Sequence, residues 1–281
     1  DRLLDFIEEN IDEEHVRTTE QLHLDAMAWQ PVPRLPLTLV YPPEDVELFP
    51  YAEAFDDPGK MLFNELVRTV GGTSTLNSVR LKDDFPPHVR SNHGIGIISS
   101  LFGARCRIIN DTMPWVEHLE PADLRTAIAK GVPELSHALG GKVLGTHHYF
   151  LEKLRGYPKC SRCVRITQPD LQGPFDIAHL LMGNDVFLAV VDDPGFVHEL
   201  LAVITDTYIA FRKQIEPQLT DTAGDRAVYL HGCLFGGKVL IKDDTAIINL
   251  SGDMHREFSK AYNDRIFAAF GGGSFHFCGP S

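Results

Sequence analysis

The chain has 281 residues, and its 26 Lys and Arg against 39 Asp and Glu give a formal net charge of −13. A 43% hydrophobic, 23% charged chain of this length can bury a large core without disulfides or metals. The acidic balance argues against a surface for nucleic acid or anionic membrane, because such surfaces need clustered Lys and Arg. No run approaches the roughly 20 apolar residues of a membrane helix, and neither a secretory signal nor a disulfide framework is visible. We therefore expect a cytoplasmic protein with no nucleic-acid or membrane partner.

Helices and strands are predicted to alternate along most of the chain. Residues 1–29 are charged with recurring apolar positions, which predicts an amphipathic helical extension. Strand-like apolar runs cover 37–40, 94–101, 107–109, 164–168, 228–230, 245–250 and 274–278, and a further apolar, β-branched run covers 186–191. Helical patterns cover 121–139, 142–155, 176–182, 194–215 and 251–270, the last two with Asp193 (or Asp192) and Ser251 as N-caps.

This alternation predicts an α/β fold with parallel strands. The two leading architectures at this length are a (β/α)8 TIM barrel and a doubly wound sheet. The sequence lacks both glycine-rich phosphate loops, which weakens the doubly wound alternative. We therefore predict residues 30–281 to be a barrel whose last βα units are missing from this chain, preceded by the helical extension 1–29.

The sharpest chemical feature is His276-Phe277-Cys278 at the end of the last predicted strand. Because side chains alternate across a strand, His276 and Cys278 point to one face and Phe277 to the other. In a barrel the His/Cys pair would face the C-terminal mouth, where catalytic groups lie. Imidazole and thiolate suit zinc, although on spacing alone a buried cysteine with a hydrogen-bonded core histidine is the commoner arrangement.

A second His-x-Cys, His231-Gly232-Cys233, follows the strand predicted at 228–230. If the two strands were adjacent, the two pairs could converge on one ion, because neighbouring strands lie about 4.8 Å apart. Cys233 is therefore a further candidate metal ligand, while His231 contacting a substrate is the simpler interpretation.

Cys160 and Cys163 form an isolated C-x-x-C before a strand, which favours a non-catalytic pair over a metal or redox site.

Other polar residues are candidates for substrate contact. Asp170 and Gln172 lie in a stiff loop with Pro169, Gly173 and Pro174, just after a predicted strand; a loop there is well placed to orient a substrate, and a helix-capping role for Asp170 is equally compatible. Asn92 and His93 open another strand-like run. Asp243 and Asp244 are either a general acid pair or ordinary turn residues.

Taken together, several segments resemble the uroporphyrinogen decarboxylase superfamily. They are Trp29–Pro36 (WQPVPRLP), Gln168–Asp176 (QPDLQGPFD), Asp192–Pro194 (DDP) with its helix, His231-Gly232, Asp243–Thr245 (DDT) and His276–Gly279 (HFCG). The resemblance covers the chain from about residue 20 to the end. It implies a (β/α)8 barrel with its active site at the C-terminal mouth.

The resemblance points to one branch of that superfamily more than to the other. The arginine-bearing motif with which true decarboxylases bind their tetrapyrrole is absent from the corresponding region, 38–43. The other branch contains corrinoid-dependent methyltransferases, such as methylcobalamin:coenzyme M methyltransferases, which hold Zn²⁺ through His-x-Cys and a later Cys. His276 and Cys278 match the first two ligands, and the third would fall beyond Ser281.

The resemblance thus implies a zinc-dependent methyltransferase that moves a methyl group from a corrinoid carrier, such as methylcobalamin on a partner protein, to a zinc-activated thiol. His276 and Cys278 would be metal ligands, Asp170 and His231 catalytic residues, and Asn92, His93 and Gln172 substrate-binding residues. A homodimer is expected on the same ground. The alternatives are a metal-free decarboxylase (a carboxy-lyase) and a non-catalytic protein that binds a tetrapyrrole or corrinoid.

Overall fold

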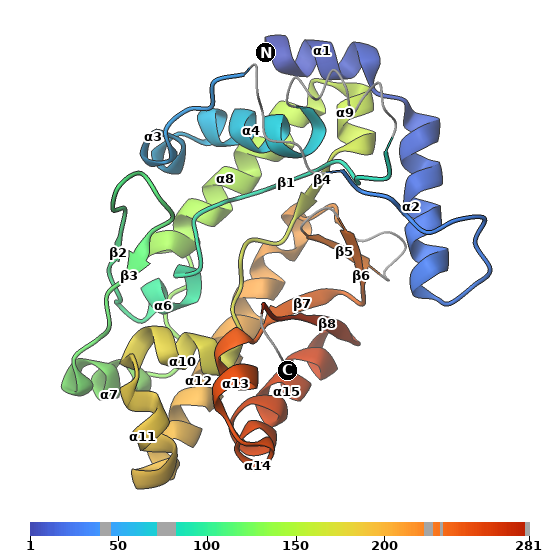
Figure 1. The fold of residues 1–281 in the computed structure, drawn as a ribbon. Helices are drawn as coiled ribbons and strands as arrows, with labels where there is room; N and C mark the ends of the chain where they lie inside the picture. Colours follow the sequence, from blue (N-terminus) through green and yellow to red (C-terminus); the bar gives the residue numbers. More distant parts are fainter. Residues whose placement is uncertain (40–45, 72–82, 222–226, 231–232, 279–281) are drawn as a thin grey trace. The chain divides into compact units, whose positions relative to one another are not determined.

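A computed structural model describes residues 1–39, 46–71, 83–221, 227–230 and 233–278 (Figure 1). The chain divides into two compact units, each built from separate stretches of sequence. Unit 1 contains Asp1–Asn92, Gly145–Pro169 and Gln218–Lys238, and unit 2 contains His93–Leu144, Asp170–Pro217 and Val239–Ser281.

Unit 1 is mainly helical, with two short pairs of strands. Its helices are α1 (Arg2–Asn10), α2 (Glu13–Met27), α3 (Tyr51–Asp56), α4 (Pro58–Leu66) with the π-helical turn η1 (Val67–Gly71), the second half of α8 (Ala138–Arg155), and α9 (Pro158–Cys163). Strands β1 (His88–Arg90) and β4 (Arg165–Thr167) are parallel, whereas β5 (Ala227–Leu230) and β6 (Cys233–Gly236) are antiparallel.

The apolar stripe at the start of the chain is buried in unit 1. Leu4 and Ile7 of α1 pack with Phe150 of α8 and Cys160 of α9 in one hydrophobic cluster, which also contains Ile166 of β4. Asp12 ends the first stripe and begins the second helix, because its side chain accepts the backbone N–H of His15 at 3.1 Å. Residues 1–29 therefore form two helices within unit 1; the division at residue 29 stays a prediction.

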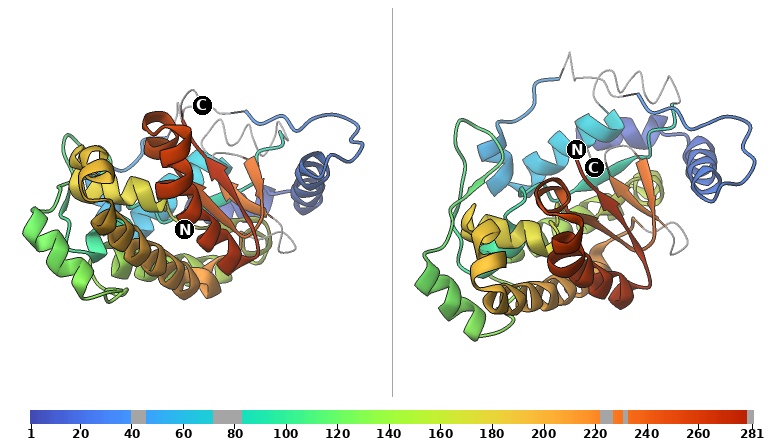
Figure 2. Two further views of the ribbon diagram at one scale, coloured as in Figure 1. Left: turned by 90° about the horizontal axis from the view of Figure 1, so that it is seen from below. Right: turned by 60° about the horizontal axis from the view of Figure 1, so that its bottom comes forward.

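Unit 2 surrounds a second parallel pair of strands. Its elements are α6 (Ile97–Leu101), β2 (Cys106–Arg107), β3 (Trp115–Val116), α7 (Pro121–Ala129), the first half of α8, α10 (Pro174–Met182), α11 (Asp185–Asp192), α12 (Pro194–Ile215), β7 (Val239–Lys242), α13 (Asp244–Asn249), α14 (Gly252–His255), η3 (Arg256–Lys260), α15 (Ala261–Phe270) and β8 (Gly273–His276); the turn η2 (Glu216–Gln218) spans the division. Figure 2 shows α12 and α15 running beside one another next to this strand pair.

The β7–β8 pair positions the residues discussed below. Val239, Leu240 and Ile241 are buried, as expected for a strand covered on both faces. The chain leaves β7, forms α13 to α15 and returns as β8, whose register sets Lys242 opposite His276. Gly271 ends α15 in the left-handed conformation, with φ 75°, which glycine adopts without steric cost.

Several predicted elements are confirmed and several are wrong. The predicted helices 142–155, 176–182, 194–215 and 251–270 and strands 164–168, 228–230 and 274–278 are present within a few residues, and Asp193 and Ser251 cap α12 and α14 through their side chains. The runs 94–101 and 245–250 are helical rather than extended, and 186–191 lies in helix α11. The described part of 37–40 is irregular, and 121–139 is helical at Pro121–Ala129 and again from Ala138, where α8 begins. The apolar runs in α11 and α13 form helices instead. In α11 burial follows the helical repeat: Val186 and Val190 are buried, whereas Leu188 and Val191 are exposed.

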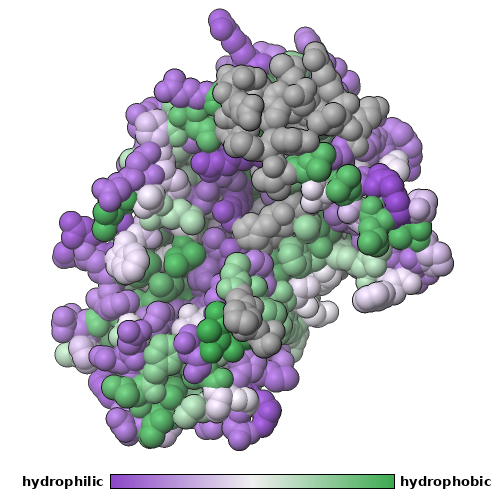
Figure 3. Space-filling view, viewed as in Figure 1, coloured by the Kyte–Doolittle hydropathy of each residue, from purple (hydrophilic) through white to green (hydrophobic). Residues whose placement is uncertain are grey.

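The mixed α/β class is confirmed, and the described strands form four two-stranded sheets without a closed barrel. Among these described helices, none alone is long and apolar enough to cross a membrane; α10 and α11 reach that length and composition only together, across a bend of 109°. Figure 3 shows hydrophobic side chains on the surface around α11, where Leu188 and Val191 are exposed.

Candidate functional site

The ends of two parallel strands in unit 2 gather the chemically active side chains. Lys242 ends β7 and His276 ends β8, and the two are direct partners in the parallel register. The carboxyl ends of parallel strands meet at one edge of the sheet, and opposed residues share a face. The residues that follow each strand, Asp243-Asp244 and Cys278, are thereby brought to the same edge (Figure 1).

His276 and Cys278 meet as the alternation of the strand predicts. The distance between His276 Nε2 and Cys278 Sγ is 3.5 Å. Asp244 joins them: one ligand atom from each of Asp244, His276 and Cys278 lies within 4.8 Å of the other two. Asp244 and His276 are half-buried and Cys278 is exposed, so the cluster is open on the side of the thiol.

Asp176 fixes the position of Asp244. This buried side chain of α10 accepts the backbone N–H of Asp244 at 2.9 Å and that of Thr245 at 2.8 Å, and so caps the start of α13. Burial and the nearby charge of Asp243 raise the pKa of Asp176 to about 7, against the lowering effect of these N–H groups. Two hydrogen bonds thus hold the backbone at the start of α13, and Asp244 Oδ1 accepts the backbone N–H of Cys278, just after β8.

Asp243 ties the two strands together behind the cluster. Its backbone N–H donates to the carbonyl oxygen of His276 at 3.2 Å. Its fully buried carboxylate accepts hydrogen bonds from Asn263 at 2.8 Å and from Ser259. Burial raises the pKa of Asp243, and these hydrogen bonds, together with nearby His255, offset part of that rise. The general acid pair considered for Asp243 and Asp244 is replaced by two separate roles, an anchor and a member of the cluster.

Asp170 and Gln172 lie beside this edge, linked to a residue that the sequence analysis did not select. The ammonium of Lys242 lies 2.6 Å from Asp170 Oδ1, and both side chains are buried. Gln172 Nε2 donates to the same carboxylate at 2.9 Å, and Gln172 also bridges Lys242 in parallel fashion. The stiff loop predicted after β4 thus forms a buried polar network with the end of β7; Asp170 pairs with a lysine rather than capping α10.

The other predicted site residues are Asn92, His93 and His231. Asn92 belongs to unit 1, where it donates to Glu65 Oε1 at 3.2 Å and its carbonyl accepts from Tyr51 at 2.8 Å. His93 is buried in unit 2. His231 lies outside the described residues.

The proposed convergence of the two His-x-Cys motifs required adjacent strands. Among the described strands, β5 pairs with β6, which begins at the exposed Cys233, and β8 pairs with β7. Cys233 is not part of the Asp244 cluster. The pairing therefore gives no support to Cys233 as a ligand beside His276.

Cys160 and Cys163 have the surroundings of structural cysteines. Both are free and buried in unit 1. Burial raises the pKa of the Cys160 thiol to about 12 and that of Cys163 to about 11, with Glu8 adding to the first and Glu13 to the second. Both groups stay protonated near neutral pH, and a protonated buried thiol is neither a good nucleophile nor a ready ligand.

The cluster fits a zinc ion by its donor set. Zinc takes imidazole nitrogen at about 2.0–2.1 Å, thiolate at about 2.3 Å and carboxylate oxygen at about 2.0–2.2 Å, most often in a tetrahedron. Two such ligands of a tetrahedral zinc lie roughly 3.5 Å apart, and the His276 to Cys278 distance is 3.5 Å. One imidazole, one thiolate and one carboxylate also balance the charge of a divalent ion.

No family model and no curated protein matches this sequence. Among solved structures, a methyltransferase from Methanosarcina mazei is similar, with a TM-score of 0.66 and 20% sequence identity over 93% of this chain and 70% of that one. The chain shares that protein's fold.

Lys242 is the functional candidate that sequence reasoning missed, and Asp244 was considered only as a general acid or a turn residue, not as a metal ligand. Lys242 ends an apolar strand and was not selected. Because a buried lysine is almost always paired with an acidic group, a lysine that follows three buried residues indicates such a partner. Asp244 looked like a turn residue because its partners His276 and Cys278 come a whole helical crossover later. The βα alternation carried the only available signal: two consecutive strands that pair in parallel bring their ends together.

Proposed function

We propose that the chain is a zinc-dependent methyltransferase of the uroporphyrinogen decarboxylase superfamily, which transfers a methyl group from a corrinoid carrier to a thiol. The observation that carries this proposal is the meeting of His276 and Cys278 at the carboxyl end of β8, with donor atoms 3.5 Å apart. The likeness in fold to a methyltransferase supports it. We also propose that the parallel pairs β1–β4 and β7–β8 belong to a (β/α)8 barrel.

His276 and Cys278 would hold the zinc ion in this account. Bound zinc would lower the pKa of a substrate thiol, which is about 8.5 in water, so that the thiol binds as the thiolate at neutral pH. The exposed side of Cys278 leaves room for that substrate. A corrinoid carrier would supply the methyl group: its cobalt–carbon bond would break with the electron pair left on the corrinoid, and the methyl carbon would bond to the substrate sulfur held beside His276 and Cys278.

The chain's other polar groups would shape the substrate position. Asp170, Gln172 and Lys242 form a network whose buried hydrogen bonds fix their side chains beside the end of β8. Polar side chains that are fixed in this way orient a substrate better than mobile side chains do. The catalytic role of Asp170 and His231, the substrate-binding role of Asn92, His93 and Gln172, the corrinoid protein partner and the homodimer remain proposals from the family resemblance.

The test is a transfer assay on zinc-loaded protein with methylcobalamin and a panel of small thiols. Thioether products are followed by mass spectrometry and the demethylated corrinoid by its absorbance. We expect transfer by wild type, loss after chelation or in Cys278→Ser, and retention in the control Cys106→Ser, whose half-buried thiol packs against Gly96. Full transfer by chelated protein or by Cys278→Ser would refute the proposal. Metal-independent decarboxylation of uroporphyrinogen would support the decarboxylase alternative instead.

A further inference from the structure

Asp244 is placed as a ligand would be, although it lies far from His276 and Cys278 in sequence. It is the first residue of α13, immediately after the buried anchor Asp243, and β7 delivers it to the edge at which β8 ends. Its carboxylate oxygen lies within 4.8 Å of both the nearest imidazole nitrogen and the Cys278 sulfur. Closing from at most 4.8 Å to about 3.5 Å between ligand atoms needs a shift of no more than about 1.3 Å.

Both the carboxylate and the backbone N–H of Asp244 are held by hydrogen bonds. Its Oδ1 accepts the backbone N–H of Cys278, which ties the carboxylate to the segment that carries the thiol. A carboxylate has two oxygens and can accept several bonds, so this contact leaves the second oxygen to serve as a ligand. Metal-binding carboxylates are commonly oriented by a hydrogen bond of this kind.

Asp176 holds the backbone of Asp244 through hydrogen bonds to the first turn of α13. It accepts the backbone N–H groups of Asp244 and Thr245, so the first turn of α13 cannot rotate without breaking two hydrogen bonds. Because Asp176 is buried, water does not easily replace those bonds. The chain therefore fixes the backbone of Asp244 through one aspartate and its carboxylate through Cys278.

We propose that Asp244 is a third protein ligand of the metal held by His276 and Cys278, and that Asp176 is its positioning residue. This assignment rests on the zinc site of the proposed function and gives that site nitrogen, sulfur and oxygen donors. Three protein ligands and an open position are typical of catalytic zinc.

The test measures metal binding directly. Metal-free protein is titrated with Co²⁺, whose visible bands report coordination geometry and whose near-ultraviolet band reports sulfur ligation, and its Zn²⁺ affinity is measured by competition with a chromophoric chelator. In Asp244→Asn and Asp244→Ala we expect roughly 100-fold weaker Zn²⁺ binding and altered visible bands, with the sulfur band retained. Asp176→Ala should weaken binding by about 10-fold while retaining the sulfur band.

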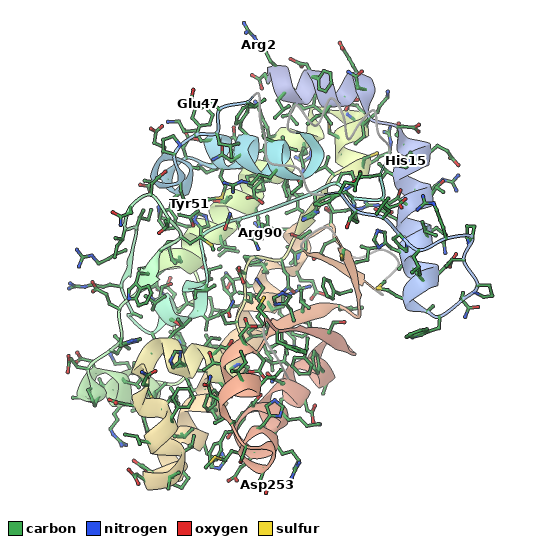
Figure 4. All side chains as sticks on the ribbon, in the orientation of Figure 1. Arg2, His15, Glu47, Tyr51, Arg90 and Asp253 are labelled. Carbon is green, nitrogen blue, oxygen red and sulfur yellow. The ribbon has the colours of Figure 1, made fainter. Side chains whose placement is uncertain are left out.

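The matched control is Asp253→Asn. Asp253 is an exposed aspartate of α14, with 91% of its side chain accessible, and Figure 4 shows it at the outer end of unit 2. This variant should bind Zn²⁺ like wild type. Asn at position 244 keeps an oxygen for the Cys278 N–H, so circular dichroism should show an intact fold. Wild-type affinity and an unchanged Co²⁺ spectrum in both Asp244 variants would overturn the assignment alone; a wild-type protein that binds neither metal would overturn the proposed zinc site with it.

Discussion

Lys242 and Asp170 form a buried ion pair, with 2.6 Å between Nζ and Oδ1, at the strand end that lies opposite His276. Burying two charges is costly, and a buried pair is often less stable than an apolar pair of the same size. A functional role for this edge of the sheet would explain why such a costly pair is present. Its energetic signature can be measured.

Lys242→Met should destabilise the protein by about 3–5 kcal/mol, because Asp170 would remain buried without its ammonium partner. The double variant Lys242→Met, Asp170→Leu should recover most of that loss, since no unpaired charge remains. Urea unfolding of the two variants and wild type measures both effects. A loss below about 1 kcal/mol in Lys242→Met would show that the pair is solvated rather than buried.

Asp84 should make unit 1 sensitive to acid. Burial by itself raises the pKa of this carboxyl, but hydrogen bonds from Arg34 and from the backbone N–H of Leu37 outweigh it and lower the pKa below its usual value. The stabilisation is therefore present above the unfolded pKa, about 3.9, and is lost as pH falls through the lower folded value.

Stability of Asp84→Asn should accordingly fall less than that of wild type when the pH is lowered below about 4, as measured by denaturant midpoints along a pH series. Asp264→Asn is the control, because Asp264 forms an exposed pair with Lys260 at the start of α15. An acid slope of Asp84→Asn equal to that of wild type would contradict the assignment.

The cysteines should separate into two classes under alkylation. Cys233 and Cys278 are exposed, whereas Cys160 and Cys163 are buried with pKa values raised to about 12 and 11. Peptide mass spectrometry after brief iodoacetamide treatment at pH 7.5 should find the first two labelled much faster. Added Zn²⁺ should protect Cys278 and leave Cys233 reactive; equal protection of the two would bring Cys233 back as a ligand.

Gly273 should tolerate no side chain. A Cβ there would lie 2.4 Å from the ring of Phe267 and 2.5 Å from the Val239 carbonyl oxygen, where β8 meets β7. Gly273→Ala should cost about 1–3 kcal/mol by overpacking. Gly195→Ala in α12, where nothing lies within 4 Å, should be neutral or stabilising by up to about 1 kcal/mol. Thermal or urea unfolding compares them, and equal stability would contradict the tight contact.

The sequence could predict those parts of the site that depend on local periodicity. His276 and Cys278 share a face because side chains alternate along a strand, and Ser251 and Asp193 cap their helices as their residue types suggest. Such patterns reach only a few residues along the chain.

The parts that sequence reasoning missed depend on tertiary contacts. The run 245–250 is apolar and β-branched, which favours a strand, but Asp176 caps its first backbone N–H groups and a helix forms. Asp244 and Lys242 acquire their partners only when β7 and β8 pair. No local pattern contains that pairing, so neither residue could be selected with confidence from its neighbours.

The most direct test of the zinc account is the metal content of full-length protein purified without chelator and without a histidine tag. Elemental analysis should find about one zinc per chain in wild type, lost in Cys278→Ser and kept in Cys106→Ser. Absence of zinc from wild type, or stoichiometric zinc in Cys278→Ser, would contradict the account and make His276 and Cys278 ordinary residues of a pocket.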